Sequence, residues 1–207
     1  MEWRNRHALN GVLLYLVSTV FICYLSFNVR INQLNPITWN ALFWIVILFA
    51  SVNAVAKSFL AEKPGRQLYY YSLVSGQQLI SARIIYNSLL LIVLALAGFI
   101  FYALILGNPV QDIGLYLLAI VLASVGLSSS LTLISAIAAK AGSNQSLVAV
   151  LGFPVILPIL LMVIKLSKNA MDGLEWSSSY KELLVLMAIN LIVGAVSYIL
   201  FPYLWRS

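Results

Sequence analysis

The sequence predicts an all-α integral membrane protein with six transmembrane helices in a single domain, residues 1–207. Of the 207 residues, 62% are hydrophobic and only 9% are charged, and the mean hydropathy is +0.99. A soluble domain has about 25% charged residues. Six apolar runs of membrane-crossing length alternate with short segments that hold the charges. The predicted spans are approximately residues 8–29, 39–56, 84–106, 113–139, 146–164 and 183–203.

The first span follows a basic start that contains Arg4 and Arg6, so a cleaved signal peptide is the competing interpretation. The apolar core of a signal peptide has about 7 to 15 residues. The run over residues 8–29 is longer, and no A-x-A site follows it, so we expect an uncleaved anchor. A short loop with Pro36 leads to the second span, whose Trp39 we expect at the membrane interface.

Residues 57–83 form the one long polar interruption in the first half of the chain. Four basic residues stand here against a single acid, so the positive-inside rule places this loop in the cytoplasm. Gly65 follows a proline and predicts a turn. Ser75 and Gln78 have the spacing of a capping box and predict the start of a new helix. The loop is also aromatic, and its tyrosines suit the headgroup level.

The second half of the chain has shorter connections. Residues 107–109 predict a turn, and residues 140–145 form a tight loop before the fifth span. In that span Pro154 and Pro158 lie four apart on one helical face, and each removes a backbone hydrogen bond. We therefore expect a kink, which is either static packing or a hinge. Residues 165–182 form a polar connection, either a short surface helix or an interfacial loop.

Charge placement predicts that both termini are cytoplasmic. This topology puts eight of the 12 basic residues on the cytoplasmic side, in keeping with the positive-inside rule. All 18 charged residues fall outside the predicted spans, which disfavours an ion-coupled carrier, because such carriers need ionisable groups near the midplane. We expect the uncharged polar residues of the spans to make helix–helix contacts and not to bind a ligand. They include Asn53, Asn87, Asn190 and a hydroxyl-rich run between Ser128 and Ser135.

The sequence predicts no catalytic residue and no metal site. Cys23 and His7 are the only residues of their kinds, so neither a disulfide within the chain nor a metal-binding motif can be formed from them. No P-loop, nucleophile elbow or HExxH run is present. The basic residues border the apolar runs and form no patch, so we do not expect a nucleic-acid partner.

Several stretches together resemble the CcmB family, the permease subunit of the cytochrome c maturation transporter, usually called haem exporter protein B. The resemblance covers most of the chain and rests on the order and spacing of its pieces. These are RHALNGVLLYLVSTVFICYLSF, SFLAE, LYYYSLVS, RIIYN, SAIAAKAG and FPVILPILL.

The resemblance implies an ABC exporter permease that uses a cytoplasmic coupling helix, in the loop over residues 57–83, to contact a separate ATPase. It implies a CcmA-like ATPase, CcmC-like and CcmE-like haem-handling partners, membrane lipid, and two copies of the chain in a bacterial inner membrane. Haem is a candidate cargo of the complex; we expect no cofactor bound by this chain alone and assign no haem-contacting residue. The implied coupling residues are Glu62, Gly65, Arg66, Leu68, Tyr69, Tyr70 and Tyr71.

Two functions remain open on the sequence. The first is a non-enzymatic permease subunit that is driven by an ATPase on another chain. The second is a membrane scaffold that moves no substrate and relays ATPase work to a haem-handling neighbour.

Overall fold

The computed structural model describes residues 6–28, 34–55, 75–141 and 145–206. The regular structure in this part of the chain is entirely helical, and six helices are long and apolar enough to cross a membrane. The six-span, all-α prediction is therefore confirmed. The elements are α1 (Arg6–Asn28), α2 (Pro36–Val55), α4 (Gly76–Leu106), α5 (Ile113–Lys140), α6 (Gln145–Met171), the 3₁₀ helix η2 (Trp176–Ser179) and α7 (Tyr180–Arg206).

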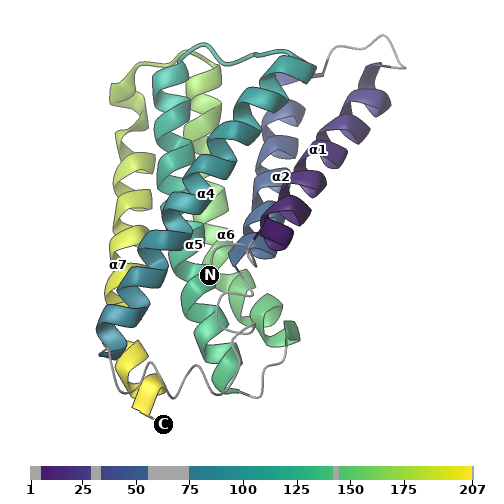
Figure 1. The fold of residues 1–207 in the computed structure, drawn as a ribbon. Helices are drawn as coiled ribbons and strands as arrows, with labels where there is room; N and C mark the ends of the chain where they lie inside the picture. The colour runs from purple at the N-terminus through teal and green to yellow at the C-terminus, as the bar shows by residue number, and fades with distance from the viewer. Residues whose placement is uncertain (1–5, 29–33, 56–74, 142–144, 207) are drawn as a thin grey trace.

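The long helices alternate in direction and form one bundle (Figure 1). We call the end where α5 and α7 begin the upper end, and the end where α4 and α6 begin the lower end. Helix α4 crosses the bundle obliquely, starting beside α7 and rising toward α2 (Figure 1). The undescribed segment 56–74 therefore joins α2 to α4 at the lower end.

Helix α5 is the centre of the bundle. In the membrane-spanning part of α5, 72% of the residues are buried, against 22% in α1 and in α7. Small side chains allow α5 to take this central position, because they let the backbones of neighbouring helices approach closely. Close packing is important here, since lipid supplies no hydrophobic driving force for helices to associate. Gly126 illustrates the point, since an added Cβ would fall on Asn190 Oδ1 of α7 and 3.3 Å from Ile159 Cδ1 of α6.

The start of α4 follows the predicted capping box. The Ser75 hydroxyl accepts a hydrogen bond from the Gln78 amide, at 3.4 Å, and the Gln78 side chain accepts one from the Ser75 amide, at 3.2 Å. These two bonds satisfy amides that would otherwise lack partners at the helix start. The helix begins eight residues before the predicted third span, so the span is the apolar part of a longer helix.

The polar connection predicted over residues 165–182 is mostly helical, which corrects that interpretation. Helix α6 continues to Met171 and α7 begins at Tyr180, so only residues 172–179 connect them. Leu166 and Ser167 are buried, and this packing extends the helix past the last apolar run. Gly173, with φ +65°, takes the left-handed conformation that often ends a helix. The short surface helix is limited to η2.

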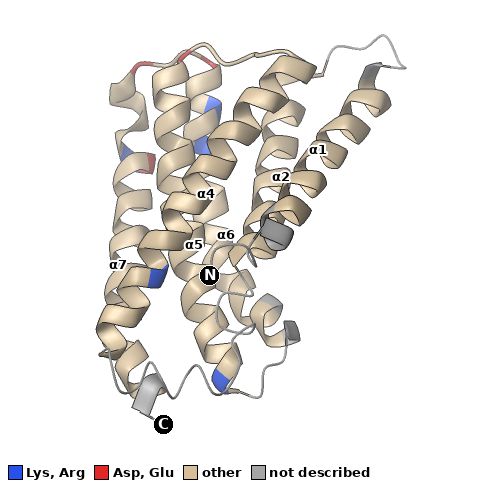
Figure 2. Ribbon diagram, in the orientation of Figure 1, with Lys and Arg blue, Asp and Glu red and all other residues tan. Residues whose placement is uncertain are grey.

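The charged residues of the described helices lie outside the predicted apolar runs but inside the helices themselves. Helix α4 has 31 residues, or about 46 Å at 1.5 Å per residue, whereas the hydrocarbon core is about 30 Å thick. The helix therefore extends beyond the hydrocarbon and can include Arg83 in an early turn. Figure 2 shows acidic positions gathered at the upper end and long uncharged stretches in the middle of the bundle.

Candidate functional site

The predicted coupling residues lie outside the described part of the chain. All seven, from Glu62 to Tyr71, fall within residues 56–74, so their assignment stays a prediction. The structure does describe the two helix ends that flank this segment, and each of them has one buried side and one exposed side. Val55, the last residue of α2, is 0% exposed, and Ile80 in the second turn of α4 is also 0% exposed.

The start of α4 is packed against the lower ends of α5 and α7. Leu79 and Ile80 form a small buried cluster with Ala136 of α5 and Phe201 of α7. The segment 56–74 is thus attached on one side to a helix end that contacts two other helices.

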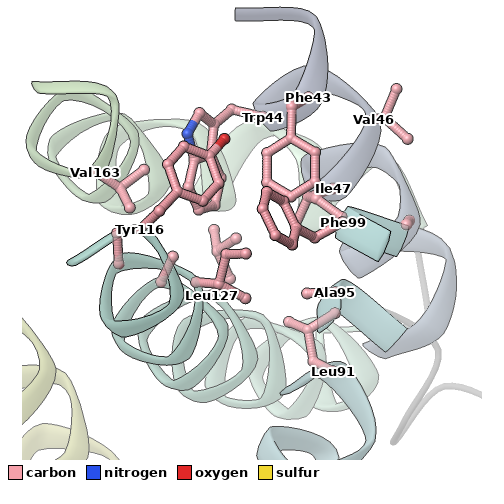
Figure 3. Close-up of a cluster of buried hydrophobic side chains, with 14 of the residues drawn as sticks. Phe43, Trp44, Val46, Ile47, Leu91, Ala95, Phe99, Tyr116, Leu127 and Val163 are labelled. Atoms are coloured by element: carbon pink, nitrogen blue, oxygen red, sulfur yellow. The ribbon is translucent and has the colours of Figure 1, made fainter. Parts of the chain in front are cut away.

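A cluster of six aromatic side chains occupies the upper half of the bundle and joins α2, α4 and α5. The Trp39 ring lies 4.7 Å from Tyr102 and 6.0 Å from Phe43, between ring centres, and the Phe99 and Tyr116 rings stack at 5.1 Å. Such contacts contribute about 0.5–1.5 kcal/mol each beyond the area they bury. Figure 3 shows several of these rings turned toward one another. The members are Trp39, Phe43, Trp44, Phe99, Tyr102 and Tyr116.

The Trp39 side chain is 1% exposed, so its ring faces other helices; its place at the depth of the membrane interface stays a prediction. Its indole Nε1 donates to the Gly107 carbonyl, at 3.0 Å, and the Tyr102 hydroxyl donates to the Trp39 carbonyl, at 3.1 Å. These bonds satisfy the polar atoms of two buried rings, which is the condition for placing them in a core. The first turn of α2 is therefore tied to the end of α4.

Polar side chains in the same region connect α2 to α5 and α6. The Tyr116 hydroxyl donates to Asn40 Oδ1, at 3.2 Å, and the Trp44 indole donates to the Ser167 hydroxyl, at 2.9 Å. None of these contacts was predicted from the sequence. The signal was available in part, because Trp39, Phe43 and Trp44 recur at helical spacing on α2. Their partners on α4, α5 and α6 could not be assigned without the tertiary structure.

The hydroxyl-rich run of α5 makes the expected helix–helix contacts with α4 in the lower half. Asn87 Nδ2 donates to Thr132 Oγ1, at 2.8 Å, and the Ser88 and Ser128 hydroxyls are 2.6 Å apart. All four side chains are buried. The prediction of helix contacts is therefore confirmed for these residues.

The two remaining asparagines differ from each other. Asn190 of α7 donates to the Leu122 carbonyl of α5, at 2.9 Å, so it too joins two helices. Its Oδ1 atom is buried and has no hydrogen-bond partner among the described residues. Asn53 is exposed and bonds to the Phe49 carbonyl of its own helix, so for Asn53 the predicted helix–helix contact is wrong. A polar side chain on the outer face can make its hydrogen bond within its own helix. The sequence does not show which face of the helix Asn53 occupies.

Pro154 and Pro158 both lie inside α6, and both are exposed on the outer surface of the bundle. The helix runs through both positions without interruption. The carbonyl oxygens of Val150 and Pro154 cannot accept the usual helical hydrogen bond from the residue four positions later, because each of those residues is a proline without an N–H. The kink and its use as a hinge stay a prediction.

The described residues contain no group of three or more His, Cys, Asp and Glu side chains that could hold a metal ion. Some of their buried polar side chains join two helices, and others bond to a carbonyl of their own helix. The part of the chain that the structure describes presents no catalytic constellation.

Comparison with known proteins adds the family. A family model described as CcmB protein matches residues 1–202. No curated protein matches the chain, and no solved structure matches it. The chain therefore belongs to the CcmB family, whose members are permease components of the ABC transporter of cytochrome c maturation.

Proposed function

We propose that this chain is the permease subunit that receives work from a separate ABC ATPase through the segment between α2 and α4. One observation carries the proposal: each of the two helix ends that flank residues 56–74 packs one side into the bundle, through Val55 of α2 and through Leu79 and Ile80 of α4. A displacement of this segment would therefore also displace the ends of α2 and α4. The family membership supplies the ATPase as the expected partner.

In this mechanism the ATPase contacts the predicted coupling residues. Glu62 offers a carboxylate in a basic segment, Gly65 permits a turn, and Leu68 with the neighbouring tyrosines supplies apolar contact. Movement then passes to α4 through Leu79 and Ile80 and to α2 through its last turn. Because the aromatic cluster joins α2, α4 and α5, these three helices would move together in the upper half.

The setting that we propose is a bacterial inner membrane with both termini cytoplasmic. Under this topology the lower end faces the ATPase, and the upper end faces the compartment where cytochrome c is assembled. We also propose a CcmA-like ATPase, CcmC-like and CcmE-like neighbours, and two copies of this chain. Haem is then a cargo of the complex and not a cofactor of this chain.

The test is the double variant Glu62→Ala with Gly65→Val in the intact complex. Membrane insertion should be unchanged, because neither residue lies in a predicted span, while co-purification of the ATPase should fall. Interface energy is concentrated in few residues, so two changes are sufficient to weaken docking. A matched control is Gly194→Ala, since an added Cβ at Gly194 meets nothing within 4 Å. Normal ATPase recovery and normal cytochrome c assembly in the double variant would contradict the coupling assignment.

A scaffold that moves no substrate is the second candidate. It is favoured by the use of described buried polar groups such as Asn87 and Trp44 for helix–helix bonds, which leaves them unavailable to line a path. Reconstituting the complex in vesicles and following haem across the bilayer separates the two functions. ATP-dependent haem movement supports the transporter, and ATPase activity without haem movement supports the scaffold.

A further inference from the structure

The outward face of α6 carries a straight stripe that is basic at its upper end and apolar below. Its members recur at spacings of four and three residues, so they lie on one side of the helix. All of them are exposed. From the lower end upward, the stripe consists of Pro154, Pro158, Leu161, Lys165 and Lys168.

The two lysines require an explanation, because charged side chains are costly beside lipid. Lys165 precedes Asp172, the first residue after α6, by seven residues, or about 10 Å along the helix axis. It therefore lies below the acidic loops of the upper end. In Figure 2 the basic positions on α6 lie within the helix, nearer the middle of the bundle than the acidic positions of the loops at the same end.

The two lysines are also free to bind an external group. Asp172 follows Lys168 by four residues, but no ion pair joins either lysine to an acid in the part of the chain that the structure describes. A lysine at this depth extends its ammonium group toward the headgroup layer. Two ammonium groups three residues apart on one helix would then meet at the level of the lipid phosphates.

Aromatic residues mark that level independently. Trp176 and Tyr180, next to the upper end of α6, are 46% and 61% exposed, and such half-exposed rings are typical of the membrane interface. The Trp176 ring is held in place, because its Nε1 donates to Asp112 Oδ2 at 2.7 Å. The headgroup layer at the upper end is therefore at the height of η2, within reach of both lysines.

The apolar part of the stripe has the length of one lipid leaflet. From Lys165 down to Pro154 is 11 residues, or about 16 Å along α6, and half of a hydrocarbon core is about 15 Å. Leu161 is 53% exposed, and the proline rings below it add an apolar surface with no N–H to donate. An acyl chain can follow this surface from the headgroup layer to the midplane.

From these observations we infer that α6 binds one anionic phospholipid of the leaflet at the upper end, with its phosphate on Lys165 and Lys168 and an acyl chain along Leu161 and the two prolines. The site does not depend on the ATPase assignment. It places a lipid directly on the helix that carries the proline pair, so the composition of that leaflet would affect α6 before any other helix.

The test uses the full chain, purified with the subunits that accompany it, in nanodiscs of phosphatidylcholine with added phosphatidylglycerol. Native mass spectrometry should find one phosphatidylglycerol retained by the unaltered chain. Lys165→Gln with Lys168→Gln should weaken its retention on the order of tenfold, since each lysine near a membrane surface contributes to anionic-lipid attraction. Lys165→Arg with Lys168→Arg keeps both charges and should retain the lipid.

Lys181→Gln is the matched control, because Lys181 is exposed at the same end but lies on α7. It should leave retention unchanged. Equal loss in this control, or full retention by the double glutamine variant, would overturn the site. A short-chain phosphatidylglycerol and inorganic phosphate test the acyl-chain part. Both should bind more weakly than the long-chain lipid, and equal binding by either would show that the apolar stripe takes no part.

Discussion

The upper and lower halves of α5 pack in different ways. In the upper half Tyr116 meets large rings from α2 and α4. In the lower half Ser128 and Thr132 meet short side chains of α4 through hydrogen bonds. The same helix therefore uses bulky aromatic contacts at one end and small polar contacts at the other.

This difference indicates where the bundle is stable and where it can move. Large buried rings lose many contacts when they shift, because interiors are close-packed. A hydrogen bond between helices in a membrane contributes about 0.6 kcal/mol on average, so the small polar contacts resist a change less. We therefore expect the lower half, which lies beside the proposed ATPase, to change shape more easily than the upper half.

The largest effect that we predict is from Trp39→Ala, which removes the ring at the centre of the aromatic cluster. We expect a loss of about 3–5 kcal/mol in the free energy of unfolding, measured as a lower midpoint of thermal unfolding in detergent. Ile37→Ala is the control, because Ile37 is 63% exposed on the same helix. A similar loss in both variants would mean that the cluster does not stabilise the upper half specifically.

A smaller effect is predicted for Gly126→Ala, between the two halves. The new Cβ would displace the Asn190 side chain, and this displacement breaks the bond to the Leu122 carbonyl. Overpacked sites lose about 1–3 kcal/mol, and we expect the lower part of that range because a side-chain end can rotate away. Gly194→Ala should have no such cost, and the difference between the two unfolding midpoints measures it. No difference would mean that α5 and α7 are not closely packed here.

The fold could be predicted largely from the sequence, whereas the site could not. The number of spans follows from the six apolar runs, and the start of α4 follows from the capping box of Ser75 and Gln78. Both features depend only on residues that are close in the sequence. The burial of Trp39 depends on Tyr102 and Gly107, which are more than 60 residues away. A tryptophan near the end of an apolar run is equally compatible with the membrane interface.

Helix ends were also hard to predict beyond the apolar runs. The charge of Lys165 predicts the start of a loop, yet α6 continues because residues at helical spacing, such as Leu166 and Ala170, pack inward. Whether a charged residue ends a span or lies on its outer face depends on the neighbouring helix. Composition predicts how many residues cross the hydrocarbon, but it does not predict which side of the helix faces its neighbours.

A still smaller effect is predicted for the polar contact of the lower half. Asn87→Ala and Thr132→Val, alone and together, form a double-mutant cycle across α4 and α5. We expect a coupling energy of about 0.6 kcal/mol, with an upper value of about 1.7 kcal/mol, from unfolding in detergent. A coupling of several kcal/mol would contradict the comparison, because the lower half would then be as firmly joined as the upper half.

The smallest effect on stability, and the most informative for function, is expected at the proline pair. Helix α6 passes from a small cluster that contains Val148 to the main hydrophobic core that contains Ile159 and Val163. Pro154 and Pro158 lie near the change from one hydrophobic cluster to the other, on the exposed side of the helix.

Replacing both prolines by alanine supplies two backbone N–H groups and should leave insertion and the unfolding midpoint unchanged or slightly raised. If the junction is a working hinge, cytochrome c production in cells should fall although the protein is stable. Leu157→Ala controls for the loss of exposed apolar surface, because Leu157 is 38% exposed between the two prolines. Normal cytochrome c production in the double alanine variant would make the kink dispensable, and movement of the lower half would then have to bypass α6.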